Sequence, residues 1–289
     1  MGKEIHLACL KAYNIIIENI ISKNGGKLGD YLFLCGNGLF HFFPYAQLNY
    51  ISELYTTIQK FIDLDKDELN SCLPGLMSSL ILLLDDTCHN NREKCIYQFF
   101  DKIQQKLKSK GGAFYGTYWS LLLRNKSLAK QGIKYLNKKI TDAKKEDEKK
   151  EILLMNEFSI NNNLVVNSLS QLFEDEDLKT VIDVLDFVKE GVPLTADNKM
   201  INEESKKILI ISVLKSLKLS SREEDSARRK VKEWLLGVKN LYNDEIDKNS
   251  EDIKYKIGLV VDALKKMFCS EKIINSNDLQ SYVHILKFY

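Results

Sequence analysis

The chain has 289 residues, and 42 basic against 40 acidic residues give it a formal net charge of +2. This balance excludes non-specific nucleic-acid binding through overall phosphate neutralisation, so any basic site must be local. Three prolines in 289 residues are few for a strand-rich fold, which needs more turn residues. The apolar runs are also far shorter than the roughly 20 residues that span a bilayer.

Taken in chain order, apolar residues at helical spacing predict about ten to twelve α-helices joined by short polar turns. The glycine pair Gly36 and Gly38 predicts a helix break or a close helix approach. The predicted turns are Lys23–Gly26, Lys110–Gly112, Asn161–Asn163 and Gly191–Pro193. The clearest amphipathic helices cover residues 178–188, 210–217, 231–238 and 253–264.

A charged run, Thr141–Lys150, predicts either a solvated helix start or a flexible linker. We place a soft sub-boundary there, near 141–150, within a single domain that covers residues 1–289. The acidic run Glu174–Asp177 directly precedes Leu178, where carboxylates favour a helix N-terminus. Capping therefore explains this cluster without a catalytic or calcium-binding role.

The strongest electrostatic feature is a row of four lysines, each four residues after the last: Lys126, Lys130, Lys134 and Lys138. On a helix this spacing places four like charges along one side, which is mildly destabilising. An anionic partner would relieve that repulsion, so the row is a candidate contact for acidic lipid headgroups or an acidic protein surface. The alternative is an exposed face that only confers solubility.

Two further clusters have a structural and a functional interpretation. A basic patch follows the acidic residues Glu223–Asp225. The patch could bind phosphate, or the neighbouring carboxylates could neutralise its positive charge locally. An aromatic set at i, i+3, i+4 spacing could be core or a partner surface. The basic patch is Arg228, Arg229, Lys230 and Lys232, and the aromatic set is Tyr115, Tyr118 and Trp119.

Catalysis, metal and cofactors have no support in the sequence. The chain has six cysteines but no C-x-x-C pair, and no secretory signal precedes them, so we expect free thiols in the cytosol. Cys72, Cys88, His89 and Cys95 fall in one window but lack the close spacing of zinc ligands. The histidines have no Ser-His or Cys-His context. We therefore predict a non-enzymatic protein without a cofactor.

Several segments occur in the order typical of one family. The chain has Leu-Pro-Gly-Leu at 73–76, an aromatic helix at 113–125 and a third helix whose segment 133–139 ends in Leu-Asn-Lys-Lys. Residues 6–13 and 30–40 before this core, and 178–188 and 228–237 after it, extend the pattern. The chain resembles the Dopey N-terminal domain over nearly its whole length. Family proteins are far longer, so we expect this chain to be a fragment.

This resemblance implies a right-handed all-α solenoid of stacked antiparallel helices of the armadillo or HEAT type, although no strict sequence period is present. It also implies a scaffold in traffic between endosomes and the Golgi, peripheral on the cytoplasmic side of those membranes. The implied partners are a protein related to Arf exchange factors, an aminophospholipid flippase and kinesin light chain. A generic protein-binding repeat without lipid contact is the alternative, and an RNA-binding repeat is a weaker one.

Overall fold

The computed structural model describes residues 2–42, 51–84, 90–110, 112–155, 163–175, 177–198, 201–216, 224–237 and 250–270. The chain divides into two compact units, Met1–Leu121 and Leu122–Tyr289, and the division falls within helix α6 (Ala113–Arg124). It therefore lies before the sub-boundary predicted near 141–150. That charged run instead carries a short helix, α8 (Glu146–Ile152), inside the second unit. Of the two alternatives for the run, the helix start is the one observed.

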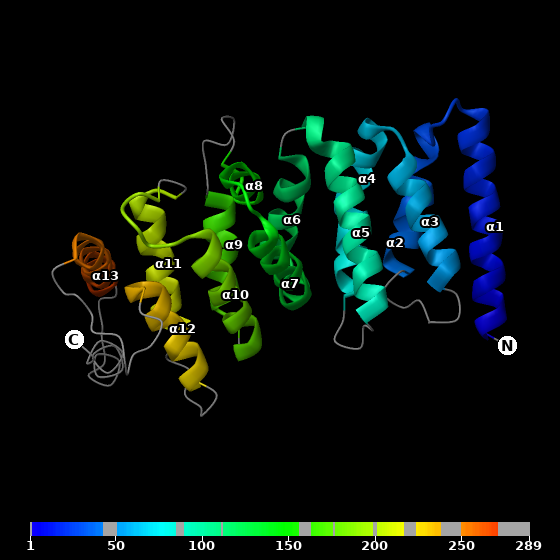
Figure 1. Ribbon diagram of the computed structural model, residues 1–289. Coiled ribbons are helices and arrows are strands. Elements are labelled where there is room, and N and C mark those ends of the chain that lie inside the picture. Colours follow the sequence, from blue (N-terminus) through cyan, green and yellow to red (C-terminus); the bar gives the residue numbers. More distant parts are fainter. Residues whose placement is uncertain are drawn as a thin grey trace. The chain divides into compact units, whose positions relative to one another are not determined.

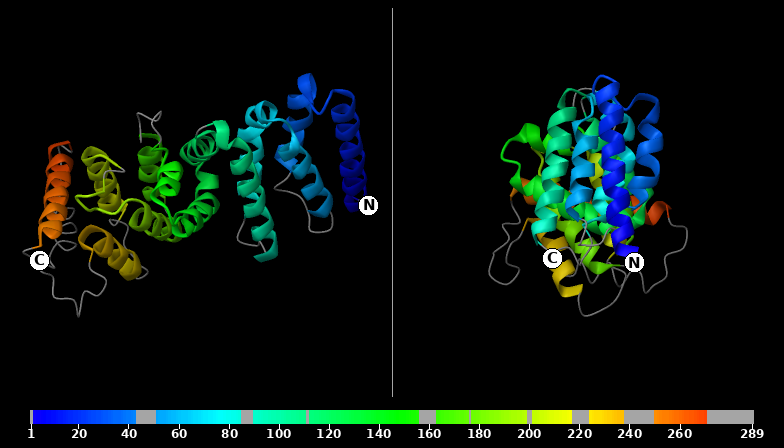
Figure 2. Two further views of the ribbon diagram at one scale, coloured as in Figure 1. Left: turned by 45° about the horizontal axis from the view of Figure 1, so that its top comes forward. Right: turned by 90° about the vertical axis from the view of Figure 1, so that its right-hand side faces the viewer.

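The first unit is a two-layer stack of helices (Figures 1 and 2). Helices α1, α3 and α5 lie side by side in one layer, and α2 packs on α4 in the other. The elements are α1 (Gly2–Lys23), η1 (Gly29–Tyr31), α2 (Leu32–Phe42), α3 (Ile51–Asp63), α4 (Lys66–Leu82), α5 (Asn90–Leu107), η4 (Lys108–Lys110) and the first part of α6.

The Leu-Pro-Gly-Leu segment lies inside helix α4, where it forms the contact with α2. Asp65 caps the helix by accepting hydrogen bonds from the backbone N–H groups of Asp67 and Glu68, both at 2.9 Å. Pro74 lies inside the helix on its exposed side, while Leu73 and Leu76 are fully buried. A Cβ atom on Gly75 would come within 2.8 Å of the Phe40 ring of α2. The glycine therefore allows α2 and α4 to approach closely.

The second unit repeats the two-layer arrangement. Helices α9, α11 and α13 form one layer, and α7, α10 and α12 form the other. The elements are the end of α6, α7 (Lys126–Asp142), α8, α9 (Asn163–Phe173), α10 (Leu178–Gly191), α11 (Glu203–Ser216), α12 (Glu224–Leu236) and α13 (Glu251–Ser270). Its core is largely aliphatic, as in the buried Val181, Val184, Leu185 and Val188 of α10, with buried aromatic rings at Tyr135, Phe173, Phe187 and Trp234.

Hydrogen bonds between successive helices of a layer reveal a regular repeat. Lys106 on α5 donates to the carbonyl of Ile62 on α3, 44 residues earlier. In the second unit the Trp234 indole donates to the carbonyl of Val192, 42 residues earlier. Separations of this size match the repeat length of armadillo and HEAT proteins, about 40–47 residues. The predicted all-α stack of repeats is confirmed within each unit, whereas its right-handed sense stays a prediction.

Several local predictions have a clear outcome. The described residues contain thirteen α-helices, more than the ten to twelve expected. Asp177 is the N-cap of α10, as its position predicted, and accepts from the Lys179 N–H at 3.1 Å. Of the two alternatives for Gly36 and Gly38, the helix break is wrong, because α2 runs through both. A Cβ atom on Gly36 would come within 2.9 Å of the Phe40 ring of the same helix, so the contact there is not with a second helix. The ends of two predicted helices, Leu217 and Val238, lie outside the described residues.

Candidate functional site

The lysine row lies on α7, the first helix of its layer in the second unit. Asn125 caps this helix by accepting from the Ser127 N–H at 3.0 Å. A buried stripe on α7 then holds the helix in its layer. Its members are Leu128, Ala129, Gly132, Ile133, Tyr135, Leu136 and Ile140. Because the stripe takes one side, the four lysines must lie on the remainder of the helix surface.

The four lysines are not equivalent. Lys126 and Lys138, at the two ends of the row, are exposed, while Lys130 and Lys134 are half-buried. Lys130 pairs with the carboxylate of Asp177 at 3.5 Å. We therefore divide the row into an outer pair that faces solvent and an inner pair that lies against carboxylates of α10.

Asp183 of α10 is the carboxylate beside the inner pair. Burial raises the pKa of Asp183, and the positive charge of Lys134 acts in the opposite direction. The backbone carbonyl of Asp183 accepts a hydrogen bond from Asn137 Nδ2 of α7 at 2.7 Å. One oxygen of the Asp183 carboxylate is buried without a hydrogen bond. Lys134 therefore serves the packing of α7 on α10, since it offsets a buried negative charge, and Lys130 serves it through its pair with Asp177 at the start of α10.

The second basic patch lies on α12, next to α10. Lys230 donates to both carboxylate oxygens of Asp186 on α10. Arg229 is exposed and lies 3.8 Å from Glu233. Burial, together with the charge of Arg228, lowers the pKa of Lys232. Compensation thus comes from α10 and from α12 itself, whereas Glu223 and the side chains of Glu224 and Asp225 lie outside what the structure describes.

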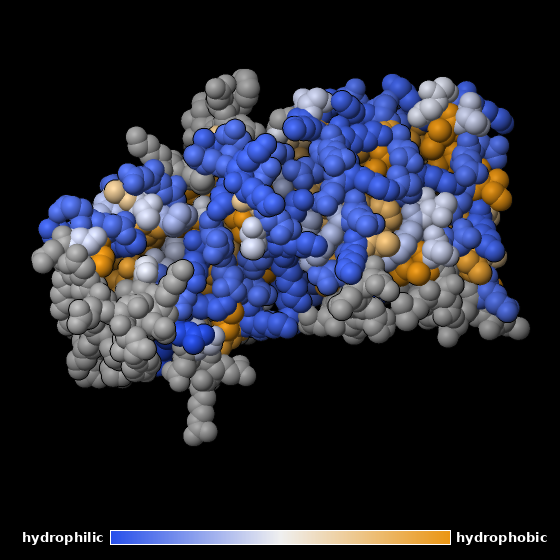
Figure 3. Space-filling model, in the orientation of Figure 1, coloured by the Kyte–Doolittle hydropathy of each residue, from blue (hydrophilic) through white to orange (hydrophobic). Residues whose placement is uncertain are grey.

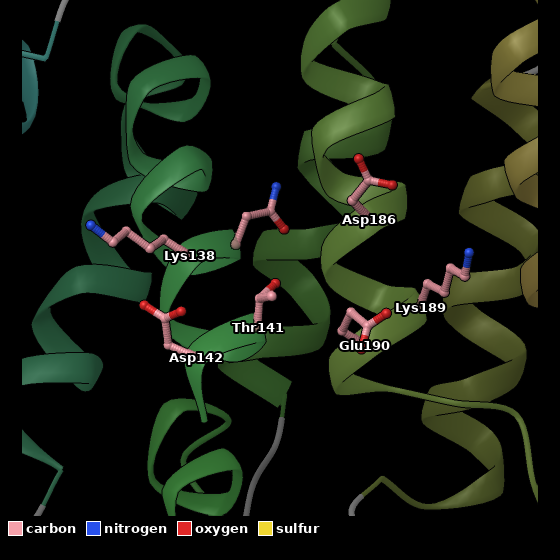
Figure 4. Close-up of a pocket in the computed structure, with 7 residues that line it drawn as sticks. Lys138, Thr141, Asp142, Asp186, Lys189 and Glu190 are labelled. Atoms are coloured by element: carbon pink, nitrogen blue, oxygen red, sulfur yellow. The ribbon is translucent and has the colours of Figure 1, made fainter. Parts of the chain in front are cut away.

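A polar groove of about 420 Å³ lies between α7 and α10, and seven residues line it. They are Asn137, Lys138, Thr141, Asp142, Asp186, Lys189 and Glu190. Figure 4 shows Thr141 and Glu190 toward the middle, while Lys138 and Lys189 point away on opposite sides. Lys189 reaches Glu233 of α12 at 2.7 Å. The groove therefore has carboxylates within it and ammonium groups at its rim.

Sequence reasoning missed a second groove, of about 450 Å³, between α3 and α5 of the first unit. Its floor is an edge-to-face pair, Tyr55 and Phe99, with ring centroids 5.5 Å apart. Lys102 lies over the Phe99 ring and donates to Gln59 Oε1 at 2.6 Å. Lys60 also lines it. Its two walls are 43 residues apart in sequence, and the sequence has no strict period of that length that could have paired them.

The aromatic set on α6 is core, and its prediction as a partner surface is corrected. Tyr115, Tyr118 and Trp119 are 1%, 0% and 0% exposed. Tyr118 packs edge-to-face on Phe100 of α5, with centroids 5.7 Å apart. Burial raises the pKa of Tyr118 well above its ordinary value. Rings of this size contribute most to stability when buried, which explains their position.

In the described parts of the chain, no group of three or more histidine, cysteine or acidic residues is placed to hold a metal ion. Cys88 and His89 of the predicted window lie outside those parts. The cysteines described are free thiols. None of the described helices combines the length and apolar character required to cross a bilayer.

The sequence of this chain matches a known protein family. The family model described as "Dopey, N-terminal" matches residues 1–240. Protein pad-1 of Caenorhabditis elegans is 26% identical over 233 residues, and protein pad-1 of Caenorhabditis briggsae is 25% identical over 233 residues. Each match covers 80% of this chain and 9% of the relative.

Among solved structures, a designed armadillo repeat protein in complex with the peptide (KR)4 aligns with 90% of this chain and 92% of its own. The identity is 12% and the TM-score is 0.27. A TM-score this low does not bear on the fold, which rests on the helix packing described above.

Proposed function

Because the chain belongs to the Dopey N-terminal family, we propose that it is a non-catalytic scaffold in membrane traffic between endosomes and the Golgi. In this role it docks anionic membrane and protein partners on the cytoplasmic side. The partners proposed for it are those of the family: a protein related to Arf exchange factors, an aminophospholipid flippase and kinesin light chain. The chain spans 9% of the length of its pad-1 relatives, so these roles are assigned to it only as part of a larger activity.

The observation that carries the lipid part is the exposure of Lys126 and Lys138. Exposed lysines next to an anionic bilayer each contribute on the order of 1 kcal/mol. The inner pair lies half-buried against α10, whereas the outer pair is the solvent-exposed part of the row. Arg229 on α12 adds an exposed charge in the same layer. We therefore propose a weak, salt-dependent membrane contact that works together with protein contacts.

The α7–α10 groove supports the protein part. Asp142, Asp186 and Glu190 line it. Asp186 already accepts from Lys230, and the carboxylates of Asp142 and Glu190 would repel a phosphate headgroup. A protein segment that brings basic or amide groups fits them better, because carboxylates are strong acceptors for such donors. This observation favours the alternative function, a protein-binding repeat without lipid contact, if the rim lysines prove unimportant.

Flotation of the full chain with vesicles that contain acidic phospholipid tests the proposal. We expect Lys126→Glu with Lys138→Glu to reduce the vesicle-bound fraction at least about fivefold, as the loss of about 1 kcal/mol from one lysine alone would do. Lys94→Glu with Lys108→Glu, which reverses two exposed charges of the first unit, is the matched control and should bind nearly as well as the wild type. Wild-type protein that stays unbound at low salt would contradict lipid docking.

A pull-down from cell extract with the same variants tests the protein part. Partners retained by the Lys126→Glu, Lys138→Glu variant but lost on Asp142→Lys with Glu190→Lys would support the groove as the protein site. If the groove variant keeps every partner that the wild type captures, the groove is not that site.

A further inference from the structure

The groove between α3 and α5 of the first unit differs in chemistry from the groove between α7 and α10. Its volume is about 450 Å³. Among the described residues that line it, two are lysines and none is a carboxylate. Figure 3 shows apolar surface between these two helices, bordered by hydrophilic residues. A groove that is apolar inside and cationic at its edge suits a ligand that is apolar at one point and anionic at another.

The lining residues form two levels along the helices. The Tyr55 and Phe99 rings, 5.5 Å apart, form the aromatic level. Lys102 and Gln59, joined by a hydrogen bond of 2.6 Å, form the charged level. On each helix the charged level follows the aromatic level by three or four residues, so the two helices run in the same direction. The levels are therefore about one helical turn, or about 5.4 Å, apart.

Lys102 carries the accessible positive charge of the groove. Its side chain is exposed, and its ammonium group lies 5.8 Å from the centre of the Phe99 ring and donates to the neutral amide of Gln59. Lys60, by contrast, is half-buried, donates to a backbone carbonyl of α1 at 3.0 Å and pairs with Glu18 at 2.5 Å. An anion that reached Lys102 would therefore displace no carboxylate within the described structure.

The aromatic level offers a place for an apolar side chain. The Phe99 ring is 7% exposed and Tyr55 is half-buried, and both line the groove. Cys95, one turn earlier on α5, extends the same wall. A large apolar side chain in this position would remove the remaining ring surface from water. A ring from the ligand could add an edge-to-face contact to the existing pair.

Spacing and hydrogen-bonding groups identify an extended peptide as the ligand. In an extended chain every second side chain lies on the same side, about 6.5–7 Å apart, which is close to the separation of the two levels. Thr56 and Gln98, one on each helix, are exposed and also line the groove. The Thr56 hydroxyl donates to the carbonyl of Ser52, so its oxygen can still accept, and the Gln98 amide can donate and accept. An extended backbone has N–H and C=O groups to offer them, whereas a helix pairs its own and an acyl chain has none.

The charge of the groove favours a carboxylate as the anion. One ammonium group balances one carboxylate, whereas a phosphate carries about two negative charges. We propose that the α3–α5 groove binds an extended segment of a partner protein in which a large apolar residue stands two positions from an aspartate or glutamate. The apolar side chain lies on Tyr55 and Phe99, and the carboxylate accepts from Lys102. This site uses neither the lysine row nor the α7–α10 groove, so it stands independently of the proposed function.

Fluorescence anisotropy of a labelled peptide with the full chain tests the spacing. The probe Gly-Glu-Ser-Phe-Ser-Glu-Gly carries a carboxylate two positions from the ring in both directions. We expect a dissociation constant on the order of 100 µM, because association costs offset much of so small a contact. The isomer Gly-Ser-Glu-Phe-Glu-Ser-Gly has its carboxylates on the opposite side from the ring and should bind at least about fivefold more weakly. Equal binding of the two isomers overturns the proposal.

Variants of the chain test the location. Lys102→Glu should weaken binding of the probe at least about tenfold, since repulsion replaces attraction, and Lys102→Arg should retain it. The charge-reversed peptide Gly-Lys-Ser-Phe-Ser-Lys-Gly should prefer Lys102→Glu over the wild type. Lys108→Glu, an exposed charge of η4 outside the groove, is the matched control and should bind the probe as the wild type does. Lys126→Glu with Lys138→Glu should also bind it normally, which separates this site from the lysine row.

Three results would overturn the proposal. The first is wild-type protein that shows no saturable binding up to about 2 mM probe, well above the expected constant. The second is a Lys102→Glu variant that keeps wild-type affinity while circular dichroism shows an unchanged fold. The third is displacement of the probe by acidic vesicles that bind the wild type and not Lys102→Glu, because a lipid would then be the occupant.

Discussion

Lys230 on α12 donates hydrogen bonds to both carboxylate oxygens of Asp186 on α10, which lies 44 residues earlier in the chain. A second pair joins the same two helices with the charges exchanged, because Lys189 on α10 donates to Glu233 on α12, again 44 residues away. The two pairs tie adjacent repeats together in one register. Lys230 of the basic patch on α12 is therefore engaged in packing on α10. The patch offers a partner less positive charge than its four cationic residues would suggest.

The Lys230–Asp186 pair should stabilise the stack only slightly, because its side chains are 23% and 44% exposed and water screens such pairs. We expect Lys230→Met or Asp186→Asn to lower the free energy of unfolding by about 0.5–1 kcal/mol. The double variant should lose less than the sum of the two. Urea denaturation measures all three. Arg229→Met should change little, and additive effects of the first two substitutions would contradict a direct interaction.

The fold class could be predicted from the sequence, but the length of the repeat could not. Stripes such as Val181, Leu185 and Val188 indicate each helix, because burial selects apolar residues at helical spacing. The repeat is carried by contacts between unlike residues. Lys60 reaches the carbonyl of Asn14, 46 residues earlier, and Lys106 reaches that of Ile62, 44 residues earlier. Backbone carbonyls accept whatever their side chains are, so the identity of the accepting residue does not have to recur.

The candidate site was predicted only in part, for a related reason. The spacing of Lys126, Lys130, Lys134 and Lys138 shows that they share a helix side but not which helix packs there. Asp177 and Asp183, which distinguish the inner pair, come from α10 and lie more than 40 residues further along the chain. For Tyr118 and Trp119, helical spacing is equally compatible with core and with surface, and only tertiary packing decides between them.

Trp119 should be among the most sensitive core positions of the chain. It is fully buried. Replacing a buried tryptophan with alanine typically costs roughly 3–5 kcal/mol of stability, because the buried apolar atoms are lost and a cavity is left behind. We expect Trp119→Ala to lower the free energy of unfolding by about that amount in urea denaturation. Phe33→Ala removes an exposed ring, 69% exposed, and should stay within about 0.5 kcal/mol of the wild type. Equal losses at both positions would contradict the observed burial.

Two glycines in helices should respond oppositely to alanine. On a helix, Gly→Ala gains up to about 1 kcal/mol of propensity. Gly258 of α13 has nothing within 4 Å of a new Cβ atom, so Gly258→Ala should raise the free energy of unfolding. At Gly75 the new atom would lie 2.8 Å from the Phe40 ring, and overpacking typically costs about 1–3 kcal/mol. Thermal unfolding should therefore show a lower melting temperature for Gly75→Ala; a rise would mean that α2 and α4 can separate freely.

Glu204 of α11 should make the second unit sensitive to acid. Its carboxylate binds Lys266 of α13 at 2.7 Å and Lys207 at 3.0 Å. These two hydrogen bonds, the one from Lys266 first, lower the pKa of Glu204 to about 2. An unfolded glutamate titrates near pH 4.3, roughly its model-peptide value. The stability that the ionised Glu204 adds to the folded state is therefore fully present above about pH 4.3 and is lost as the pH falls through about 2.

Carbon-detected NMR titration of the Glu204 carboxyl measures this directly. Lys266→Met should raise the pKa, because it removes the first of the two hydrogen bonds. Glu204→Gln should melt at a lower temperature than the wild type at pH 6, and the difference should shrink through about pH 2 and vanish below it, where the wild-type carboxyl is protonated as well. High salt should reduce the difference at pH 6, since the group is exposed and screened. A carboxyl that titrates near pH 4.3 in the folded protein would show that α11 and α13 are not joined through this residue.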